Sequence, residues 1–230
     1  MTNGPRPGVP ERGLWIPDPA QRNDLAVFAE RVLRLDPAAV IRLRTRADGL
    51  VGAWAVTGFD VLVARAVTGR VRPLDVTCAA DRLVPGLRAA DETGFYDQGY
   101  PMDSAWRGGL PPETGFVRLD DVPAAVFADL ARQGAELARE SGSAQGPPTS
   151  LMDQEVLTVI AGDTGGDTAG DTSAGVPMRC VLALEAMRFV PDPAPESEVV
   201  RVSVHPAWLR IDARFGSVFR RRGDHALLLG

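Results

Sequence analysis

"AVIRLRTRADGLVGAWAVTGFDVLVARAV", residues 39–67, contains apolar residues that recur with a period of two. Ile41, Leu43 and Thr45 alternate with arginines, and the dipeptide "DG" that follows is typical of a hairpin turn. Two further β-branched runs, "LVGAWAVT" and "VLVARAV", are separated by "GFD". The stretch therefore predicts an antiparallel β-meander.

A helix is predicted before the meander. In "DPAQ", Asp18 can cap a helix whose first position is occupied by Pro19. Apolar residues then follow at helical spacing up to Leu35, and Pro37 ends the pattern.

After the meander, "PLDVT" predicts a fourth strand and "AADRLVPGLRAA" a helix that Pro85 and Gly86 make short or kinked. A helix, a hairpin-linked sheet and a second helix resemble in layout one repeat unit of a ring-shaped DNA sliding clamp. The layout is generic, the chain has room for about one such unit, and no clamp motif accompanies it. No function is therefore carried over from this resemblance.

Residues 91–115 form a long segment rich in Gly and Pro, which predicts an ordered loop. Its four aromatic residues could serve a function, but the favoured interpretation is that they pin the loop to the domain as a small satellite core. A helix is predicted over 120–140, with Asp120 or Asp121 at its N-terminus and Val126, Leu130 and Leu137 along one side.

The domain plan predicted from these patterns has four parts: a disordered tail over 1–13, an α+β domain over 14–140, a linker over 141–150 and a C-terminal subdomain over 151–230. The subdomain begins with "LMDQEVLTVI", which is ambiguous between helix and strand, although its β-branched end favours a strand.

The rest of the subdomain is a predicted helix from Pro177 to Pro191, followed by the strands "VVRVSV", "AWLRIDARF" and "SVFRRR". A helix leading into a basic hairpin is the outline of a winged-helix module and also of a plain α+β subdomain, and the plain form is favoured. The predicted fold class is α+β, with an antiparallel meander, packed helices and a smaller helix and β-hairpin unit.

The segment 161–175, "AGDTGGDTAGDTSAG", repeats Gly-Asp-Thr with a period of four. Calcium repeats of the RTX type need a period of nine and interleaved apolar residues, and an EF-hand loop needs a glutamate at its twelfth position. The segment meets neither requirement and is predicted to be a flexible surface loop.

Composition indicates a folded protein, with 45% hydrophobic and 24% charged residues among 230. No apolar run has the length of a membrane span and no signal peptide is evident, so we expect a cytoplasmic protein without membrane contact. Cys78 and Cys180 are far apart and are expected to be reduced and buried. All 25 basic residues are arginine, and with stretches such as "WLRIDARFGSVFRRR" the chain resembles uncharacterised conserved cytosolic proteins of actinobacteria, which offer no catalytic residues to transfer.

The sequence nominates no catalytic, cofactor-binding or metal-binding residue, and its two histidines, His205 and His225, lie outside any catalytic motif. Arginines outnumber acids by 11 to 7 in residues 1–72 and by 6 to 2 in 199–230, whereas acids outnumber arginines by 21 to 8 between them. The candidate contacts for an anionic partner are Arg42, Arg44, Arg46, Arg210, Arg214, Arg220, Arg221 and Arg222.

The favoured interpretation is that the basic ends pair with the acidic middle inside the folded chain. The predicted function is a non-enzymatic binding or regulatory protein whose partner is a protein or a nucleic acid. The alternatives are a nucleic-acid-associated protein that uses the basic C-terminal hairpin and, third, a hydrolase with dispersed catalytic residues.

Overall fold

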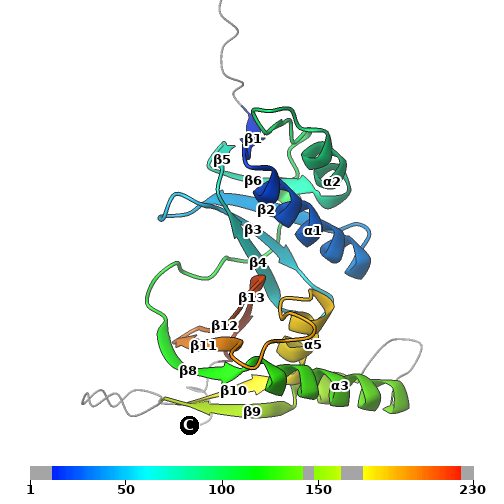
Figure 1. The fold of residues 1–230 in the computed structure, drawn as a ribbon, viewed down its shortest axis with the longest axis vertical. Helices are drawn as coiled ribbons and strands as arrows, with labels where there is room; N and C mark the ends of the chain where they lie inside the picture. The colour runs from blue at the N-terminus through cyan, green and yellow to red at the C-terminus, as the bar shows by residue number, and fades with distance from the viewer. Residues whose placement is uncertain (1–11, 142–147, 162–172, 224–230) are drawn as a thin grey trace, which may run out of the picture. The chain divides into compact units, whose positions relative to one another are not determined.

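The computed structural model describes residues 12–141, 148–161 and 173–223 (Figure 1). The architecture is α+β with antiparallel sheets, as the sequence predicts. The chain forms two compact units, with Met1–Trp54 and Ala66–Gly108 in unit 1, and Ala55–Arg65 and Gly109–Gly230 in unit 2. Within the described residues, no helix is both long and apolar enough to cross a membrane.

Unit 1 contains a sheet in which β2 lies between β3 and β6 and pairs with both antiparallel. The strands are β2 (Val40–Thr45), β3 (Val51–Val56) and β6 (Asp75–Ala79). The alternation seen in the sequence is confirmed, because Ile41 and Leu43 are fully buried while Arg42 and Arg44 point to the other face. The predicted fourth strand is confirmed as β6, which pairs with β2.

Two helices of unit 1 pack against each other, α1 (Pro19–Leu35) and α2 (Ala80–Ala89) (Figure 1). The predicted cap of α1 is confirmed, since the Asp18 carboxylate accepts a hydrogen bond of 2.8 Å from the backbone N–H of Ala20. Its buried side includes Leu25, Phe28 and Val32, at the spacing that the sequence predicts.

A second, small sheet in unit 1 orders β1 (Gly13–Trp15) between β5 (Arg70–Arg72) and β7 (Phe95–Tyr96). Phe95, from the long loop, packs on Trp15 with ring centroids 5.2 Å apart, as the satellite-core interpretation predicts. Tyr100 does not take part, because 92% of its surface is exposed. One short 3-10 helix, η1 (Asp103–Ala105), completes the loop.

Unit 2 contains a five-stranded antiparallel array ordered β4-β13-β12-β11-β8. Its strands are β4 (Leu62–Val67), β8 (Val117–Pro123), β11 (Val199–His205), β12 (Trp208–Ala213) and β13 (Gly216–Arg221). One face is apolar, and Val202, Ile211 and Val218 on it are fully buried. The three C-terminal strands therefore belong to a larger sheet than the wing of a winged helix would form.

Helices α3 (Ala124–Ser141) and α5 (Met178–Ala186) pack against each other in unit 2 (Figure 1). A Cβ on Gly134 of α3 would lie 2.4 Å from the sulfur of Met178, so the glycine permits this close approach. The predicted apolar side of α3 was wrong in part: Val126 and Leu130 are half-buried, whereas Leu137 is 44% exposed, and the buried residues are Phe127 and Ala131.

The predicted start of the helix over 120–140 was also wrong. Residues 117–123 form β8, which pairs with β11, so Asp121 lies opposite Arg201 in a strand instead of capping a helix. Similarly, α5 ends at Ala186 and not near Pro191, because Arg188 adopts a left-handed conformation with φ of 45°.

A two-stranded antiparallel sheet of β9 (Glu155–Ile160) and β10 (Ser173–Pro177) follows the short helix α4 (Thr149–Asp153). The ambiguous stretch 151–160 is thus helical at its beginning and a strand at its end. Of the predicted flexible loop 161–175, residues 162–172 lie outside the described residues, and Ser173 already belongs to β10.

The last passage of the chain from unit 1 to unit 2 falls between Gly108 and Gly109, whereas the sequence places a linker at 141–150. The difference arises because β8, which precedes α3, pairs with β11 in the sheet of unit 2. Residues 142–147 of that linker and residues 1–11 of the predicted tail lie outside the described residues, and Gly13 begins β1.

Candidate functional site

Two of the three arginine candidates of unit 1, Arg42 and Arg44, lie on one face of β2, because alternate residues of a strand point to the same side, and Arg46 directly follows the strand. Arg42 donates two hydrogen bonds of 2.7 Å to the carboxylate of Asp75 on β6. Asp75 precedes Thr77, the strand partner of Arg42, by two residues. This hydrogen bond raises the pKa of Arg42. Arg44 lies 4.0 Å from the same carboxylate. The positive charges of β2 are therefore offset inside unit 1.

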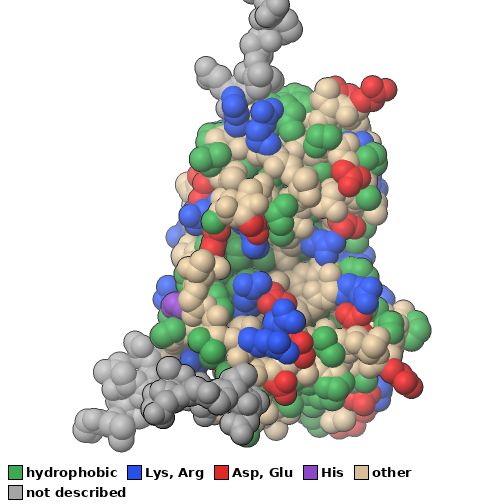
Figure 2. Space-filling view, turned by 60° about the vertical axis from the view of Figure 1, so that its left-hand side comes forward, with side chains coloured by type: hydrophobic (Ala, Val, Ile, Leu, Met, Phe, Trp, Pro, Cys, Tyr) green, Lys and Arg blue, Asp and Glu red, His purple; other side chains and the backbone are tan. Residues whose placement is uncertain are grey.

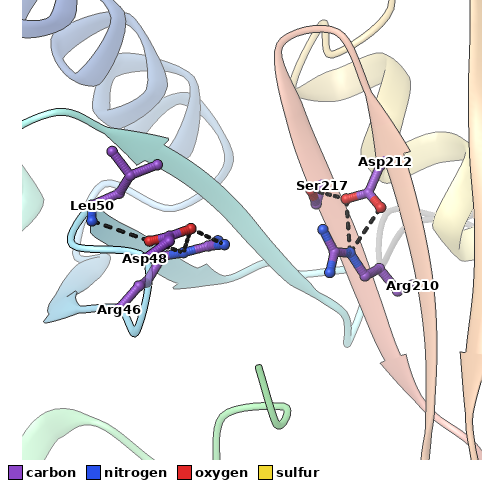
Figure 3. Close-up of polar contacts among 6 residues, drawn as sticks. All are labelled: Arg46, Asp48, Leu50, Arg210, Asp212 and Ser217. Atoms are coloured by element: carbon purple, nitrogen blue, oxygen red, sulfur yellow. Dashed lines mark hydrogen bonds and ion pairs between the residues drawn. The ribbon is translucent and has the colours of Figure 1, made fainter. Parts of the chain in front are cut away.

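Arg46 stabilises the turn between β2 and β3 (Figure 3). Its guanidinium lies 2.8 Å from the Asp48 carboxylate, which also accepts a 3.1 Å hydrogen bond from the backbone N–H of Leu50. The hydrogen bond from Arg46 is the main reason that the pKa of Asp48 is lowered. This arginine supports a hairpin and does not extend a basic surface.

In unit 2, Arg210 lies on the face of the sheet opposite the buried valines. Its Nε is 2.8 Å from Asp212, whose carboxylate also accepts a 2.5 Å hydrogen bond from the Ser217 hydroxyl (Figure 3). The guanidinium lies 5.7 Å from the ring centroid of Phe116 and 5.6 Å from that of Phe219. Arg210 is thus held both by an acid and by aromatic rings.

Two further arginines of unit 2 have equally defined neighbours. Arg214 donates to Glu198, which is only 8% exposed, and this contact raises the pKa of Arg214. Arg221 lies 5.4 Å from the ring centroid of Trp208, its partner in the β12–β13 register.

These pairings of arginine with aromatic rings were not predicted from the sequence. The sequence contains the signal for them, because a two-residue turn joins Ala213 to Gly216 and so fixes the register of β12 and β13. Counting outward from this turn places Phe219 opposite Arg210 and Arg221 opposite Trp208. Both rings are nearly covered, with exposures of 5% for Phe219 and 6% for Trp208. They support the arginines and do not offer open stacking platforms.

Arg220 belongs to a cluster centred on Asp153, at the end of α4. One carboxylate oxygen of Asp153 lies 3.1 Å from Arg220 and 2.6 Å from Arg179 of α5. The hydrogen bond from Arg220, followed by that from Arg179, lowers the pKa of Asp153. Arg179 is only 8% exposed and also donates a 3.0 Å hydrogen bond to the carbonyl of Phe59. The sequence analysis nominated neither Arg179 nor Asp153, because their proximity arises only from the packing of α4, α5 and β13.

A pocket of about 350 Å³ opens beside this cluster, within unit 2. It is lined by residues of α4, β9, β10, β12 and the end of β13. Three of the eight candidate arginines meet there, Arg220, Arg221 and Arg222, together with the carboxylates of Asp153 and Glu155. The arrangement can bind a charged ligand. Arg210 and Arg214 do not line this pocket.

Reactive groups elsewhere in the described residues are held in structural roles. Burial raises the pKa of the Cys78 and Cys180 thiols to about 12, and both are free, as the sequence predicts. His205 accepts a 3.2 Å hydrogen bond at Nδ1 from Ala207 and packs on Phe116. Over the described ranges, no group of three or more His, Cys, Asp or Glu could hold a metal ion. His225 lies outside the described residues.

Solved structures show that this fold is that of the bacterial DNA polymerase sliding clamps. A DNA polymerase sliding clamp from Bacillus subtilis is similar at a TM-score of 0.58 and 13% identity, over 93% of this chain and 66% of that one. A proposed DNA polymerase III beta subunit from Eubacterium rectale is similar at a TM-score of 0.56 and 10% identity, over 93% of this chain and 66% of that one. A beta sliding clamp from C. crescentus is similar at a TM-score of 0.52 and 17% identity, over 93% of this chain and 65% of that one.

The chain thus spans about two thirds of the length of these clamps and shares their fold. The likeness extends over nearly the whole chain, whereas the sequence analysis found room for about one clamp unit.

Family models match both units. Residues 111–225, half of the chain, match Domain of unknown function (DUF8185), and the chain belongs to this family. Residues 9–108 match Domain of unknown function (DUF8010). The two matched ranges meet where the chain passes for the last time from unit 1 to unit 2, at Gly108 and Gly109. No curated protein matches the chain.

Proposed function

We propose that this protein is a non-enzymatic binding protein that uses a sliding-clamp fold to bind a protein partner. The observation that carries the proposal is the fold shared with DNA polymerase sliding clamps over 93% of the chain. A clamp is a binding scaffold, so the same scaffold supports binding here more readily than catalysis.

The charges favour a protein partner over duplex DNA. Unit 1 contains 13 arginines and 12 acids, and unit 2 contains 12 arginines and 18 acids. Sequence-independent DNA binding depends on arginines that neutralise phosphates. Here six of the eight candidate arginines contact carboxylates, and Figure 2 shows basic side chains interspersed with acidic ones on the displayed face. Net attraction to a polyanion is therefore small.

Exposed apolar residues favour a protein partner for unit 2. Of the eight large apolar side chains that are exposed in the described ranges, six belong to this unit. Val117 is 64% exposed and Ile160 is 62% exposed. The buried core of a protein interface is more apolar than the rest of the surface, so exposed side chains such as these can become covered when a protein binds.

A nucleic-acid partner is the second candidate. It is favoured by Arg221, which is exposed beside Trp208 and, within the described ranges, has no carboxylate partner. Aromatic rings next to arginines occur in single-strand binding sites. The low exposure of Trp208 counts against this function, because a base could not stack on a covered ring.

Site-specific photocrosslinking in living cells tests the proposal. A photoreactive phenylalanine derivative is placed singly at Val117 and Ile160, and at the exposed Leu74 of unit 1 as the matched control. We expect a protein adduct of discrete mass from at least one position in unit 2 and none from Leu74. The identified partner, once purified, should bind with a Kd of about 10 μM or tighter. Equal smears from all three positions, or no adduct, would contradict the proposal.

A further inference from the structure

The small sheet of unit 1, ordered β5-β1-β7, has one face in the core and one that reaches solvent (Figure 1). Leu14, on the central strand, is fully buried on the first face. Directly opposed residues of antiparallel strands point to the same side, so Trp15, Arg70 and Phe95 share the second face. Arg72 also lies on it, because it follows Arg70 by two residues in β5. This second face is called the arginine–aromatic face below.

Two aromatic rings lie next to each other on the arginine–aromatic face. The ring centroids of Trp15 and Phe95 are 5.2 Å apart. A Cβ on Gly13 would lie 2.5 Å from Cε2 of Phe95 and 2.9 Å from Cη2 of Trp15, so the missing side chain lets both rings lie against the sheet. Both rings are only half-buried, whereas Trp208 and Phe219 of unit 2 are nearly covered. The rings of unit 1 therefore offer surface on which a planar group can stack.

Two arginines place positive charge beside these rings. The guanidinium carbon of Arg70 lies 4.4 Å from the ring centroid of Trp15, which is a cation–π contact. Arg70 and Arg72 are both exposed. Among the residues that the structure describes, neither of them has a carboxylate partner, unlike Arg42 and Arg46 of the same unit. Their N–H groups are available to an anion.

One carboxylate belongs to the same face. Extending the β1–β7 register by one pair beyond Leu14 and Tyr96 places Asp97 opposite Gly13. The Asp97 carboxylate accepts a 2.9 Å hydrogen bond from the backbone N–H of Gly99 and so supports the turn that follows β7. Two arginines against one acid leave the arginine–aromatic face with a net positive charge.

Single-stranded nucleic acids require both kinds of group. Their bases stack on aromatic rings or on guanidinium planes, and their phosphates contact arginines. A duplex presents phosphates but keeps its bases stacked inside, so the rings add nothing to duplex binding. An acidic protein segment likewise pairs with the arginines and has no bases to stack. The combination therefore favours a single strand over both.

We infer that the arginine–aromatic face of unit 1 binds single-stranded nucleic acid. Bases stack on the exposed parts of Trp15 and Phe95 and on the Arg70 guanidinium, and Arg72 contacts a phosphate. This activity goes beyond the protein partner proposed above and does not depend on it. Arg221 and Trp208 of unit 2 take no part in it.

Fluorescence anisotropy of the full chain tests the inference with fluorescein-labelled oligothymidine and oligouridine strands of about 12 nucleotides, within the site size of known single-strand binding folds. We expect at least one strand to bind with a Kd below about 50 μM at about 0.05 M salt. Two phosphate contacts predict a slope of about −1.4 for the logarithm of the association constant against that of the salt concentration. The tighter of the two strands shows whether DNA or RNA is preferred, because only RNA carries the 2′-hydroxyl.

Two further probes separate a single strand from other anions. A duplex of about 12 base pairs and a glutamate oligomer of about 12 residues should each bind at least about tenfold more weakly than the preferred strand, since neither offers bases for stacking. Equal binding of either probe would indicate general attraction of anions and overturn the inference. No saturable binding of either strand up to about 200 μM protein would overturn it as well.

Three variants locate the site. Phe95→Leu keeps an apolar side chain beside Trp15 but loses the ring, and should weaken strand binding by about fivefold or more. Arg72→Gln should weaken binding and bring the salt slope about 0.7 nearer to zero, because one phosphate contact is lost. Arg132→Gln, on the exposed side of α3 in unit 2, should change neither the affinity nor the slope. An equal loss in Arg132→Gln would indicate diffuse charge attraction and contradict the assignment.

Thermal unfolding checks that the variants remain folded. Arg72 is exposed and makes no side-chain contact with another described residue, so Arg72→Gln should unfold at the temperature of the wild type. It therefore tests the inference even if Phe95→Leu unfolds. Unchanged affinity and slope in folded Arg72→Gln would contradict binding at this face.

Discussion

Replacing Arg179 by methionine should destabilise the protein, although this residue is no candidate for contact with a partner. The side chain is 8% exposed and donates to Asp153 at 2.6 Å and to the Phe59 carbonyl at 3.0 Å. Hydrogen bonds to charged groups contribute about 1.5–3 kcal/mol each. Asp153 is 46% exposed and retains its contact with Arg220, so water and that contact offset part of the loss. We expect a decrease of about 2 kcal/mol in the free energy of unfolding.

Urea denaturation followed by circular dichroism measures this change, as a shift of about 1 M in the midpoint for a slope of about 2 kcal/mol per molar urea. Arg132→Met is the matched control, because Arg132 and its partner Asp129 are 64% and 58% exposed. An exposed pair of this kind contributes less than about 0.5 kcal/mol. If Arg179→Met lowers the free energy of unfolding no more than Arg132→Met does, Arg179 does not stabilise unit 2 through these contacts.

Two further outcomes follow from the geometry. Gly216→Ala should lower the unfolding free energy by about 1–3 kcal/mol, because its Cβ would lie 2.5 Å from the Phe189 ring, whereas Gly58→Ala, with open space around it, should change the urea midpoint little. In an NMR titration, the Asp153 carboxyl should titrate below its ordinary value of 3.8, and Arg220→Gln should raise that pKa. Since the folded pKa is lowered, this carboxylate stabilises the fold above pH 3.8, and the stabilisation is lost as the pH falls through the lowered value. A value unchanged by Arg220→Gln would contradict the contact.

Local patterns predicted the elements whose signals lie within a few residues. The alternation around Ile41 and the Asp18 cap each depend on neighbouring residues, and both are confirmed. The start of α3 was wrong because strand pairing between Asp121 and Arg201, 80 residues apart, outweighed the capping tendency of an aspartate. Pairing at that separation leaves no local pattern in a single sequence.

The candidate site was predicted in part for the same reason. The sequence nominated Arg220, Arg221 and Arg222 because they are adjacent, and they do meet in one pocket. Asp153 and Glu155, which give that pocket its mixed charge, precede β13 by more than 60 residues. Charges counted by segment along the sequence favoured pairing of the basic ends of the chain with its acidic middle. Contacts such as Arg220 with Asp153 are consistent with that interpretation.

The binding of the full chain to a fluorescein-labelled DNA duplex of about 30 base pairs separates a charge-balanced protein binder from a DNA binder. The measurement is fluorescence anisotropy at about 0.15 M salt and again at low salt. For a charge-balanced protein binder we expect no saturable binding at the higher salt up to about 10 μM protein. Saturable binding with a Kd below about 1 μM, with a salt dependence that Arg210→Gln and Arg221→Gln each reduce, would contradict it.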